Sequence, residues 1–116
     1  MLEHYVVFRP HPGREDRLAD AVRELAAAVA GAVPGLLELT WGENTNPSGL
    51  ARGYTHGCLG RFQDARAFDA YWEHPAHQRF MARLDEVCAD RFAIDYATGG
   101  TDPVGGTDPA DRGSSG

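Results

Sequence analysis

The sequence predicts a single α+β domain in which strands and helices follow the order βαββαβ. Four short stretches alternate apolar and polar side chains with the period of a β-strand. Between the first and second of these, and again between the third and fourth, apolar side chains repeat at helical spacing. This order is the ferredoxin-like, or split βαβ, arrangement, in which helices cover one face of a four-stranded antiparallel sheet.

The first half of the chain predicts two strands joined by a helix. Residues 2–8 alternate as a strand does, and one face carries His4, Val6 and Phe8. Residues 14–30 repeat apolar side chains at helical spacing before glycine and proline end the helix at 31–35. Residues 36–42 predict the second strand. One face of that strand is expected to carry Leu37, Leu39 and Trp41.

The second half predicts two further strands around a broken helix. An Asn- and Pro-containing loop at 43–52 precedes a strand at 53–62. Asp64 can cap a short helix, and Pro75 starts a longer one to about Asp90, because proline is favoured at the first helical position. Residues 91–97 predict the last strand. Its alternating apolar side chains are Phe92, Ile94 and Tyr96.

Length and composition predict one domain with a polar tail. Residues 1–98 suffice for a modest core, whereas residues 99–116 are almost free of apolar side chains and are expected to be disordered. Helices on one side leave the other sheet face bare, and Tyr5 and Val7 are expected to lie on it. A second copy packed sheet to sheet would cover that face, so we expect a homodimer.

Charge and residue usage argue against several functional classes. A net charge of −6 disfavours nucleic acid and anionic membranes as partners. No apolar run approaches the roughly 18 residues of a membrane span, and no signal-peptide pattern is present, so we expect a cytoplasmic protein. All 11 basic residues are arginine, which excludes a lysine Schiff base and lysine-bound pyridoxal phosphate. Glycine motifs for phosphates or dinucleotides are missing too, and we expect no cofactor.

Three histidines and a tyrosine are the side chains best suited to chemistry. His4 and His56 lie on strands that are central neighbours in the 4-1-3-2 strand order of this fold. His77 extends the apolar stripe of the last helix, and Tyr71 ends the segment before Pro75. Such groups are costly in an apolar interior unless they bond each other or line a cavity, as in small-molecule sites. The alternative is a pair of core histidines bonded to backbone carbonyls, with His4 at the surface.

Two other kinds of site are less favoured by their spacing. His74 and His77 flank Pro75 at i, i+3, whereas zinc sites usually show i, i+4 spacing or a carboxylate partner, so we expect no metal. Cys58 and His56 share a strand face, but side chains two residues apart rarely touch well enough for a Cys-His nucleophile. We expect Cys58 and Cys88 to be buried thiols.

Four motifs resemble the stress-responsive α/β-barrel domain family, Dabb. They are Trp41-Gly42-Glu43-Asn44, Gly53-Tyr54-Thr55-His56-Gly57, His74-Pro75-Ala76-His77 and Asp95-Tyr96. The resemblance covers about residues 3–97 and implies a dimeric α+β barrel. The family includes polyketide cyclases of the olivetolic acid cyclase type, which close a poly-β-keto thioester by aldol condensation without a cofactor.

This resemblance implies roles for individual residues. His77 matches the general base, and Tyr71 matches the residue that orients or polarises the substrate. His4 and His56 match pocket residues, and the remaining candidate substrate-binding residues are Val6, Cys58 and Phe80. The alanines at 26–28 stand where olivetolic acid cyclase, a plant enzyme, has larger apolar groups, so the resemblance implies a wider cavity and a different substrate.

The sequence therefore favours a cofactor-independent polyketide cyclase whose substrate is a small poly-β-keto compound. The composition is typical of a high-GC bacterial genome. Three alternatives remain: a non-catalytic dimer that binds a small hydrophobic ligand, a cofactor-free monooxygenase of aromatic polyketides, and a purely structural dimer. A structural dimer would have a solid helix–sheet layer, whereas a ligand site would have a cavity there of several hundred Å³.

Overall fold

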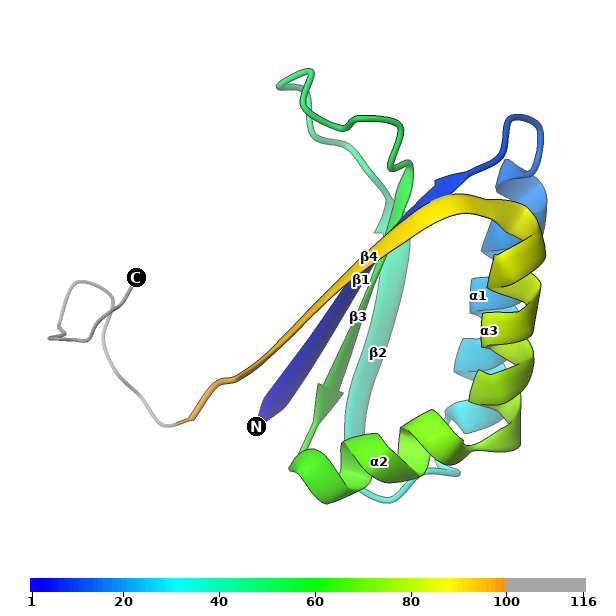
Figure 1. The fold of residues 1–116 in the computed structure, drawn as a ribbon. Helices are drawn as coiled ribbons and strands as arrows, with labels where there is room; N and C mark the ends of the chain where they lie inside the picture. Colours follow the sequence, from blue (N-terminus) through cyan, green and yellow to red (C-terminus); the bar gives the residue numbers. More distant parts are fainter. Residues whose placement is uncertain (100–116) are drawn as a thin grey trace, which may run out of the picture.

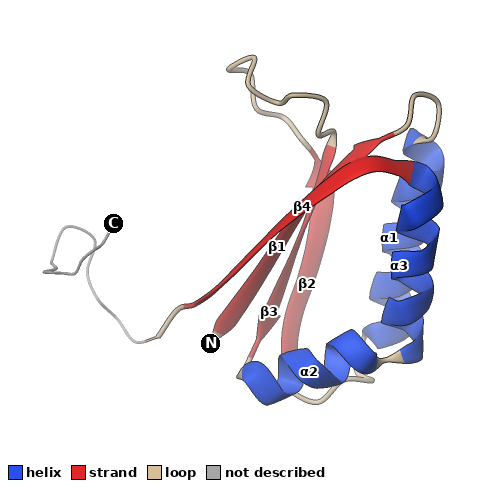
Figure 2. Cartoon of the chain, viewed as in Figure 1, coloured by secondary structure: helices blue, strands red, loops and turns tan. Residues whose placement is uncertain are grey.

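The computed structural model describes residues 1–99 as a four-stranded antiparallel sheet with helices on one side (Figures 1 and 2). The elements are β1 (Leu2–Pro10), α1 (Glu15–Val29), β2 (Leu36–Glu43), β3 (His56–Phe62), α2 (Ala65–Glu73), α3 (Pro75–Val87) and β4 (Cys88–Ala97). The strands lie in the order β2-β3-β1-β4, so the predicted ferredoxin-like α+β fold is confirmed. Apart from Gly99, the predicted disordered tail lies outside the described residues.

The register of β1 decides which side chains meet over the sheet. Val6 lies opposite Cys58 of β3 on one side and Ala93 of β4 on the other. His4 lies opposite Asp95 of β4. Because side chains alternate along a strand and paired residues point the same way, all of these share the side that faces the helices.

The hydrophobic core lies between this side of the sheet and the helices. Four side chains of α1 repeat at helical spacing and are at most 2% exposed: Leu18, Val22, Leu25 and Val29. The sheet contributes Phe8 and Phe62, which are fully buried. Burying each such side chain stabilises the fold by about 1.5–3 kcal/mol. The core thus holds α1 against the sheet, and α2 and α3 extend it with side chains such as Tyr71 and Phe80.

Helices α2 and α3 meet at a corner formed by His74 and Pro75. Pro75 is the first residue of α3, as predicted, and Nδ1 of His74 accepts a hydrogen bond from the Ala76 N–H at 3.0 Å. His74 therefore caps α3 with its own side chain. The corner brings His77, in the first turn of α3, against Tyr71 of α2, with 4.5 Å between their ring centroids.

The expected facing of the second strand is wrong at one position. The pairing of β2 with β3 shifts between Leu36 and Glu38. A shift of this kind adds one residue to a strand and turns its side chain out of the alternation. Leu36 accordingly packs on the core, while Leu37 is 55% exposed and does not share a face with Leu39.

Three further predicted boundaries also move. The last helix ends at Val87 rather than near Asp90, and β4 begins at Cys88, because Cys88 already pairs with Pro10 of β1. The third strand begins at His56 rather than at residue 53. Gly53 has a φ of +82°, which belongs to a turn and not to extended backbone.

The sheet face opposite the helices is apolar and open within residues 1–99. Phe92, Ile94 and Tyr96 of β4 are 60%, 52% and 47% exposed there. The ring of Tyr5 stacks on Tyr96, with 5.6 Å between centroids, and Val7 lies beside them on β1. The bare face expected from the sequence is therefore present, and β4 makes it larger than Tyr5 and Val7 alone.

Gly35 sets how closely α2 approaches the start of β2. Its φ is +87°, and a Cβ at this position would lie 2.5 Å from the Cβ of Ala67. Gly31 also has a positive φ, +71°, but open space around it. We expect Gly31→Ala to cost about 1–2 kcal/mol of unfolding free energy, from the backbone conformation alone. Gly35→Ala should cost clearly more, and equal losses in chemical denaturation would contradict this packing.

Candidate functional site

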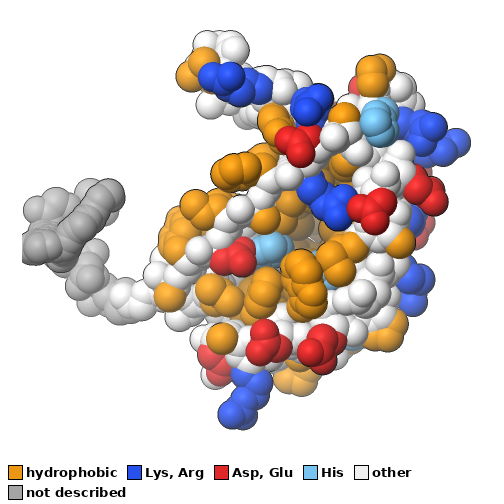
Figure 3. Space-filling view, in the orientation of Figure 1, with side chains coloured by type: hydrophobic (Ala, Val, Ile, Leu, Met, Phe, Trp, Pro, Cys, Tyr) orange, Lys and Arg blue, Asp and Glu red, His pale blue; other side chains and the backbone are white. Residues whose placement is uncertain are grey.

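A cavity of about 110 Å³ opens between the sheet and helices α2 and α3. Figure 3 shows this hollow, with histidine side chains at its bottom and hydrophobic side chains around it. Its polar lining groups are His4, Tyr71, His77 and Arg91. The rest of the lining comes from Val6, Phe8, Cys58, Trp72, Phe80, Met81, Leu84 and Ala93. The cavity is smaller than the several hundred Å³ expected, and is close to the size that holds one six-membered ring.

His77 is buried in this cavity as a neutral imidazole. Its Nδ1 lies 3.2 Å from the carbonyl oxygen of Trp72, and a carbonyl can only accept, so Nδ1 carries the proton. Burial lowers the pKa of His77 to about 4, against the opposing effect of the Trp72 hydrogen bond, and nearby His4 lowers it further. At neutral pH the Nε2 atom of His77 is therefore an unprotonated acceptor, as a general base requires.

In His4 the Nδ1 atom also carries a proton, and here the acceptor is a carboxylate. Its Nδ1 lies 2.5 Å from Oδ1 of Asp95, and the carboxylate accepts the hydrogen bond. The antiparallel register puts the two residues opposite each other on β1 and β4. A carboxylate on Nδ1 fixes the orientation of an imidazole ring. In the sequence Asp95 stands out only in the Asp95-Tyr96 motif. The start of the first strand and the end of the last strand lie side by side when the two are antiparallel neighbours, and this could have indicated the pair.

Tyr71 lies between the two imidazoles. Its ring centroid is 4.5 Å from that of His77 and 6.3 Å from that of His4. Burial raises the pKa of the phenol well above its usual range, and Cys58 adds to the effect. The hydroxyl therefore stays protonated at neutral pH and can donate a hydrogen bond to an oxygen that gains negative charge.

Cys58 contributes an apolar wall to the cavity rather than a nucleophile. It lies opposite Val6 on the helix-facing side of the sheet, and burial raises the pKa of its thiol to about 12. The thiolate is the nucleophilic form of cysteine, and it is negligible at neutral pH with such a pKa. This argues against the Cys-His alternative.

His56 does not line the cavity, in contrast to the expectation from the sequence. It lies opposite Phe8, four residues along β1 from His4, which is about 13 Å at 3.3 Å per residue. Its Nδ1 contacts Oγ1 of Thr55 at 2.7 Å, and it lines an open hollow beside Tyr54 and the 43–47 loop. The antiparallel register separates the two histidines, although they share a side of the sheet.

The expected alanine wall is wrong as well. Among the described residues, no side chain of α1 lines the cavity, whose helical walls are α2 and α3. Three consecutive residues spread over more than half of a helix circumference, so 26–28 cannot all face one way. Leu25 and Val29 face the core instead, and Ala27 and Ala28 are exposed.

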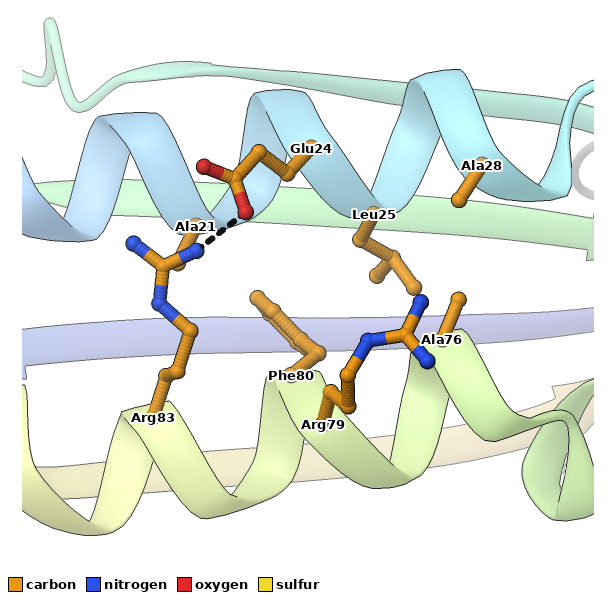
Figure 4. Close-up of a pocket in the computed structure, with 8 residues that line it drawn as sticks. All are labelled: Ala21, Glu24, Leu25, Ala28, Ala76, Arg79, Phe80 and Arg83. Atoms are coloured by element: carbon orange, nitrogen blue, oxygen red, sulfur yellow. Dashed lines mark hydrogen bonds and ion pairs between the residues drawn. The ribbon is translucent and has the colours of Figure 1, made fainter.

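A second hollow, of about 90 Å³, lies between α1 and α3 on their outer side (Figure 4). Arg83 of α3 pairs with Glu24 of α1 across it, and Arg79 borders it further along α3. Its floor is alanine with Leu25 and Phe80. Unlike the first cavity, it contains no imidazole or phenol.

Residues 1–99 hold no group of three or more His, Cys, Asp or Glu side chains arranged to bind a metal ion. His74, one of the pair considered for zinc, uses its Nδ1 to cap α3. In the same part of the chain, no helix has the length and apolar character needed to span a membrane.

The sequence matches one known protein family over almost its whole described length. Residues 2–98 match the stress-responsive A/B barrel domain, Dabb. The chain belongs to the Dabb family. The match covers nearly all described residues and confirms the resemblance found in the four motifs. No curated protein matches this Dabb chain in sequence.

Solved structures share the fold of this Dabb domain. A dimeric ferredoxin-like protein of unknown function from Jannaschia sp. CCS1 is 31% identical, with a TM-score of 0.76 over 84% of this chain and 98% of that one. A protein from Thermobifida fusca YX with the same description is 22% identical, with a TM-score of 0.70 over 84% and 90%. The hydroxynitrile lyase of Passiflora edulis is 20% identical, with a TM-score of 0.71 over 88% and 96%. At such identities the last two show a shared fold alone.

The neutral state of His77 makes stability depend on pH. Its pKa is about 4 in the folded protein and about 6.5 in an unfolded chain, so the unfolded state binds more protons between these values. The contribution of the neutral His77 ring to the unfolding free energy is fully present above pH 6.5 and falls as the pH drops toward 4. The loss is at most about 3 kcal/mol, reduced by water at the cavity mouth.

We expect the unfolding free energy of His77→Gln to fall less than that of the wild type between pH 7.5 and 4.5. The measurement is urea denaturation at one fixed protein concentration. His11→Gln, at an exposed turn, should keep the full dependence. The same pH dependence in His77→Gln and the wild type would show that His77 is not buried as a neutral imidazole.

Proposed function

We propose that this protein is a cofactor-independent enzyme that closes a short poly-β-keto intermediate into a ring by an aldol-type condensation. The observation that supports the proposal most directly is the pairing of His77, neutral with a free Nε2, with the protonated phenol of Tyr71. Both line a cavity that is otherwise mostly apolar. We place the protein in the cytoplasm, where its two buried, free cysteines stay reduced.

The first step is removal of a proton from carbon. A methylene between two carbonyls is acidic enough for an imidazole to deprotonate if the enolate is stabilised. Nε2 of His77 takes the proton, and the Tyr71 hydroxyl donates a hydrogen bond to the enolate oxygen. The negative charge that develops in the cavity raises the proton affinity of His77 during the transfer, because opposite charges attract strongly at low dielectric.

The second step forms the ring. The enolate carbon attacks a ketone carbon of the same chain, which creates the carbon–carbon bond and leaves an alkoxide. The imidazolium of His77 returns its proton to that alkoxide, and its low pKa favours this return. Holding the two reacting carbons together in a shaped cavity can lower the barrier by about 7–11 kcal/mol.

The size of the cavity limits the substrate. A space of about 110 Å³ suits a short chain that yields a single ring. This supports a smaller substrate than the wide cavity expected from the alanines at 26–28. The hydroxynitrile lyase of Passiflora edulis is an enzyme with this fold, which is compatible with a catalytic role here. At 20% identity it shows a shared fold and not a shared reaction.

Activity should depend on the two residues in the cavity and not on their counterparts outside it. We expect His77→Ala to slow ring closure of a synthetic tetraketide thioester by about 10²–10⁴-fold. Tyr71→Phe should slow it by about 10²–10³-fold, the effect of losing one oxyanion donor. His11→Ala and Tyr54→Phe remove a histidine and a phenol outside the cavity and should keep full activity. The aromatic absorbance that appears once the cyclic alcohol loses water and enolises measures the rate.

This assay and two further measurements separate the alternatives. Full activity in His77→Ala and Tyr71→Phe would remove both residues from the mechanism. Ligand-induced thermal stabilisation without turnover would identify a non-catalytic binding protein. Oxygen uptake with an anthrone would identify a monooxygenase instead.

We also propose that the open sheet face joins two copies of this chain. The related proteins from Jannaschia and Thermobifida are described as dimeric. In this chain the face is apolar, with Phe92, Ile94 and Tyr96 exposed, and exposed patches of this kind mark interfaces between proteins.

Placing a charge in this face should separate the copies. We expect Ile94→Asp to be a monomer in sedimentation velocity, with circular dichroism showing that it is folded. Leu50→Asp puts the same charge on an apolar side chain that is 67% exposed in a loop, and it should stay a dimer. A dimeric Ile94→Asp would place the interface elsewhere.

A further inference from the structure

A guanidinium reaches the cavity that holds the imidazoles and the phenol. Arg91 lies on β4 opposite Phe8, on the side of the sheet that faces the helices, and lines the cavity with Phe8 and Ala93. The strand alternation that exposes Phe92 on the open face turns Arg91 inward. The other lining groups, apart from the two imidazoles and the phenol, are apolar or a thiol.

Arg91 has most of its hydrogen-bonding capacity free for a ligand. Its Nη1 lies 3.0 Å from Oδ1 of Asp85, whose side chain is 70% exposed. Ion pairs exposed in this way are weak and easily exchanged. A guanidinium has five N–H donors in one plane, which match the two oxygens of a carboxylate. A carboxylate entering the cavity can therefore bind Arg91 alongside or in place of Asp85.

Arg91 and the acid–base groups lie at opposite ends of the cavity floor. Asp95 and its partner His4 mark one end, and Arg91 lies four residues away along β4. This is about 13 Å at 3.3 Å per residue. A molecule that touches both ends is elongated, and the wall between them is apolar, with Val6 and Phe80.

We propose that Arg91 binds a carboxylate at the end of the substrate remote from His77 and Tyr71, so that the poly-β-keto chain of the proposed reaction is slender and carries a free acid group. The assignment rests on the proposed function, since it concerns the same cavity. A single guanidinium beside Asp85, in a chain of net charge −6, suits a monoanion better than a phosphate. Arg91 is thus a specificity residue that selects an acid over its neutral analogues.

A matched pair of probes tests this assignment. We expect 4-phenylbutanoate to bind the wild type at least tenfold more tightly than 4-phenylbutanamide, which has the same shape without the charge, in isothermal titration calorimetry. Arg91→Met keeps an unbranched stem and should abolish the preference for the acid. Asp85→Asn removes the competing carboxylate and should tighten binding of the acid alone. Arg83→Met, in the outer hollow, should change neither affinity.

Several results would overturn the assignment. These are equal affinities for acid and amide in the wild type, no binding of the acid at millimolar concentration, and an undiminished preference in Arg91→Met. Shifts of the His4 and His77 ring protons in NMR spectra of the bound acid should place it in the cavity, and shifts confined to other residues would count against it.

The binding test of Arg91 and the test of ring closure have independent outcomes, so one proposal can be refuted while the other stands. Selective binding of the acid, lost in Arg91→Met, would leave Arg91 assigned even if the wild type closes no ring. Ring closure that depends on His77, together with equal binding of acid and amide, would support the proposed function and refute the role of Arg91.

Discussion

The hydrogen bond from Nδ1 of His77 to the carbonyl of Trp72 is the contact on which the site depends. It fixes the proton of a buried imidazole on one nitrogen and leaves the other free to accept. The carbonyl is available because α2 ends at Glu73, and the last carbonyls of a helix lack partners within it. Pro75 then starts α3 at once, so the end of one helix supplies the acceptor and the start of the next supplies the ring.

The second imidazole, His4, comes from the sheet and is oriented by a side chain of the neighbouring strand. His4 has no helix end beside it, and Asp95 of the neighbouring strand holds its Nδ1 proton. Both rings therefore hold Nδ1 against an oxygen atom, with Tyr71 between them as a donor. A base, a second imidazole backed by a carboxylate and a phenol are sufficient for proton transfer to and from carbon without a metal ion.

Local patterns predicted the parts of this arrangement that depend on few neighbouring residues. Tyr71, Pro75 and His77 lie within seven residues, so helix-start chemistry alone places the phenol against the imidazole. The His4–Asp95 pair and the exclusion of His56 depend on which residues of distant strands lie opposite each other. Alternation along a strand fixes a side chain's face but not this register, because a slip by two residues preserves the alternation. The inward position of Arg91 follows from alternation, whereas its place in the cavity again requires the register.

The most direct test is a ¹⁵N NMR titration of the His77 ring, assigned with the His77→Gln variant. At pH 7 only Nδ1 should carry a proton, and the ring should titrate near pH 4. A proton on Nε2 at neutral pH, or a titration midpoint near the usual value of about 6.5, would contradict this state of His77.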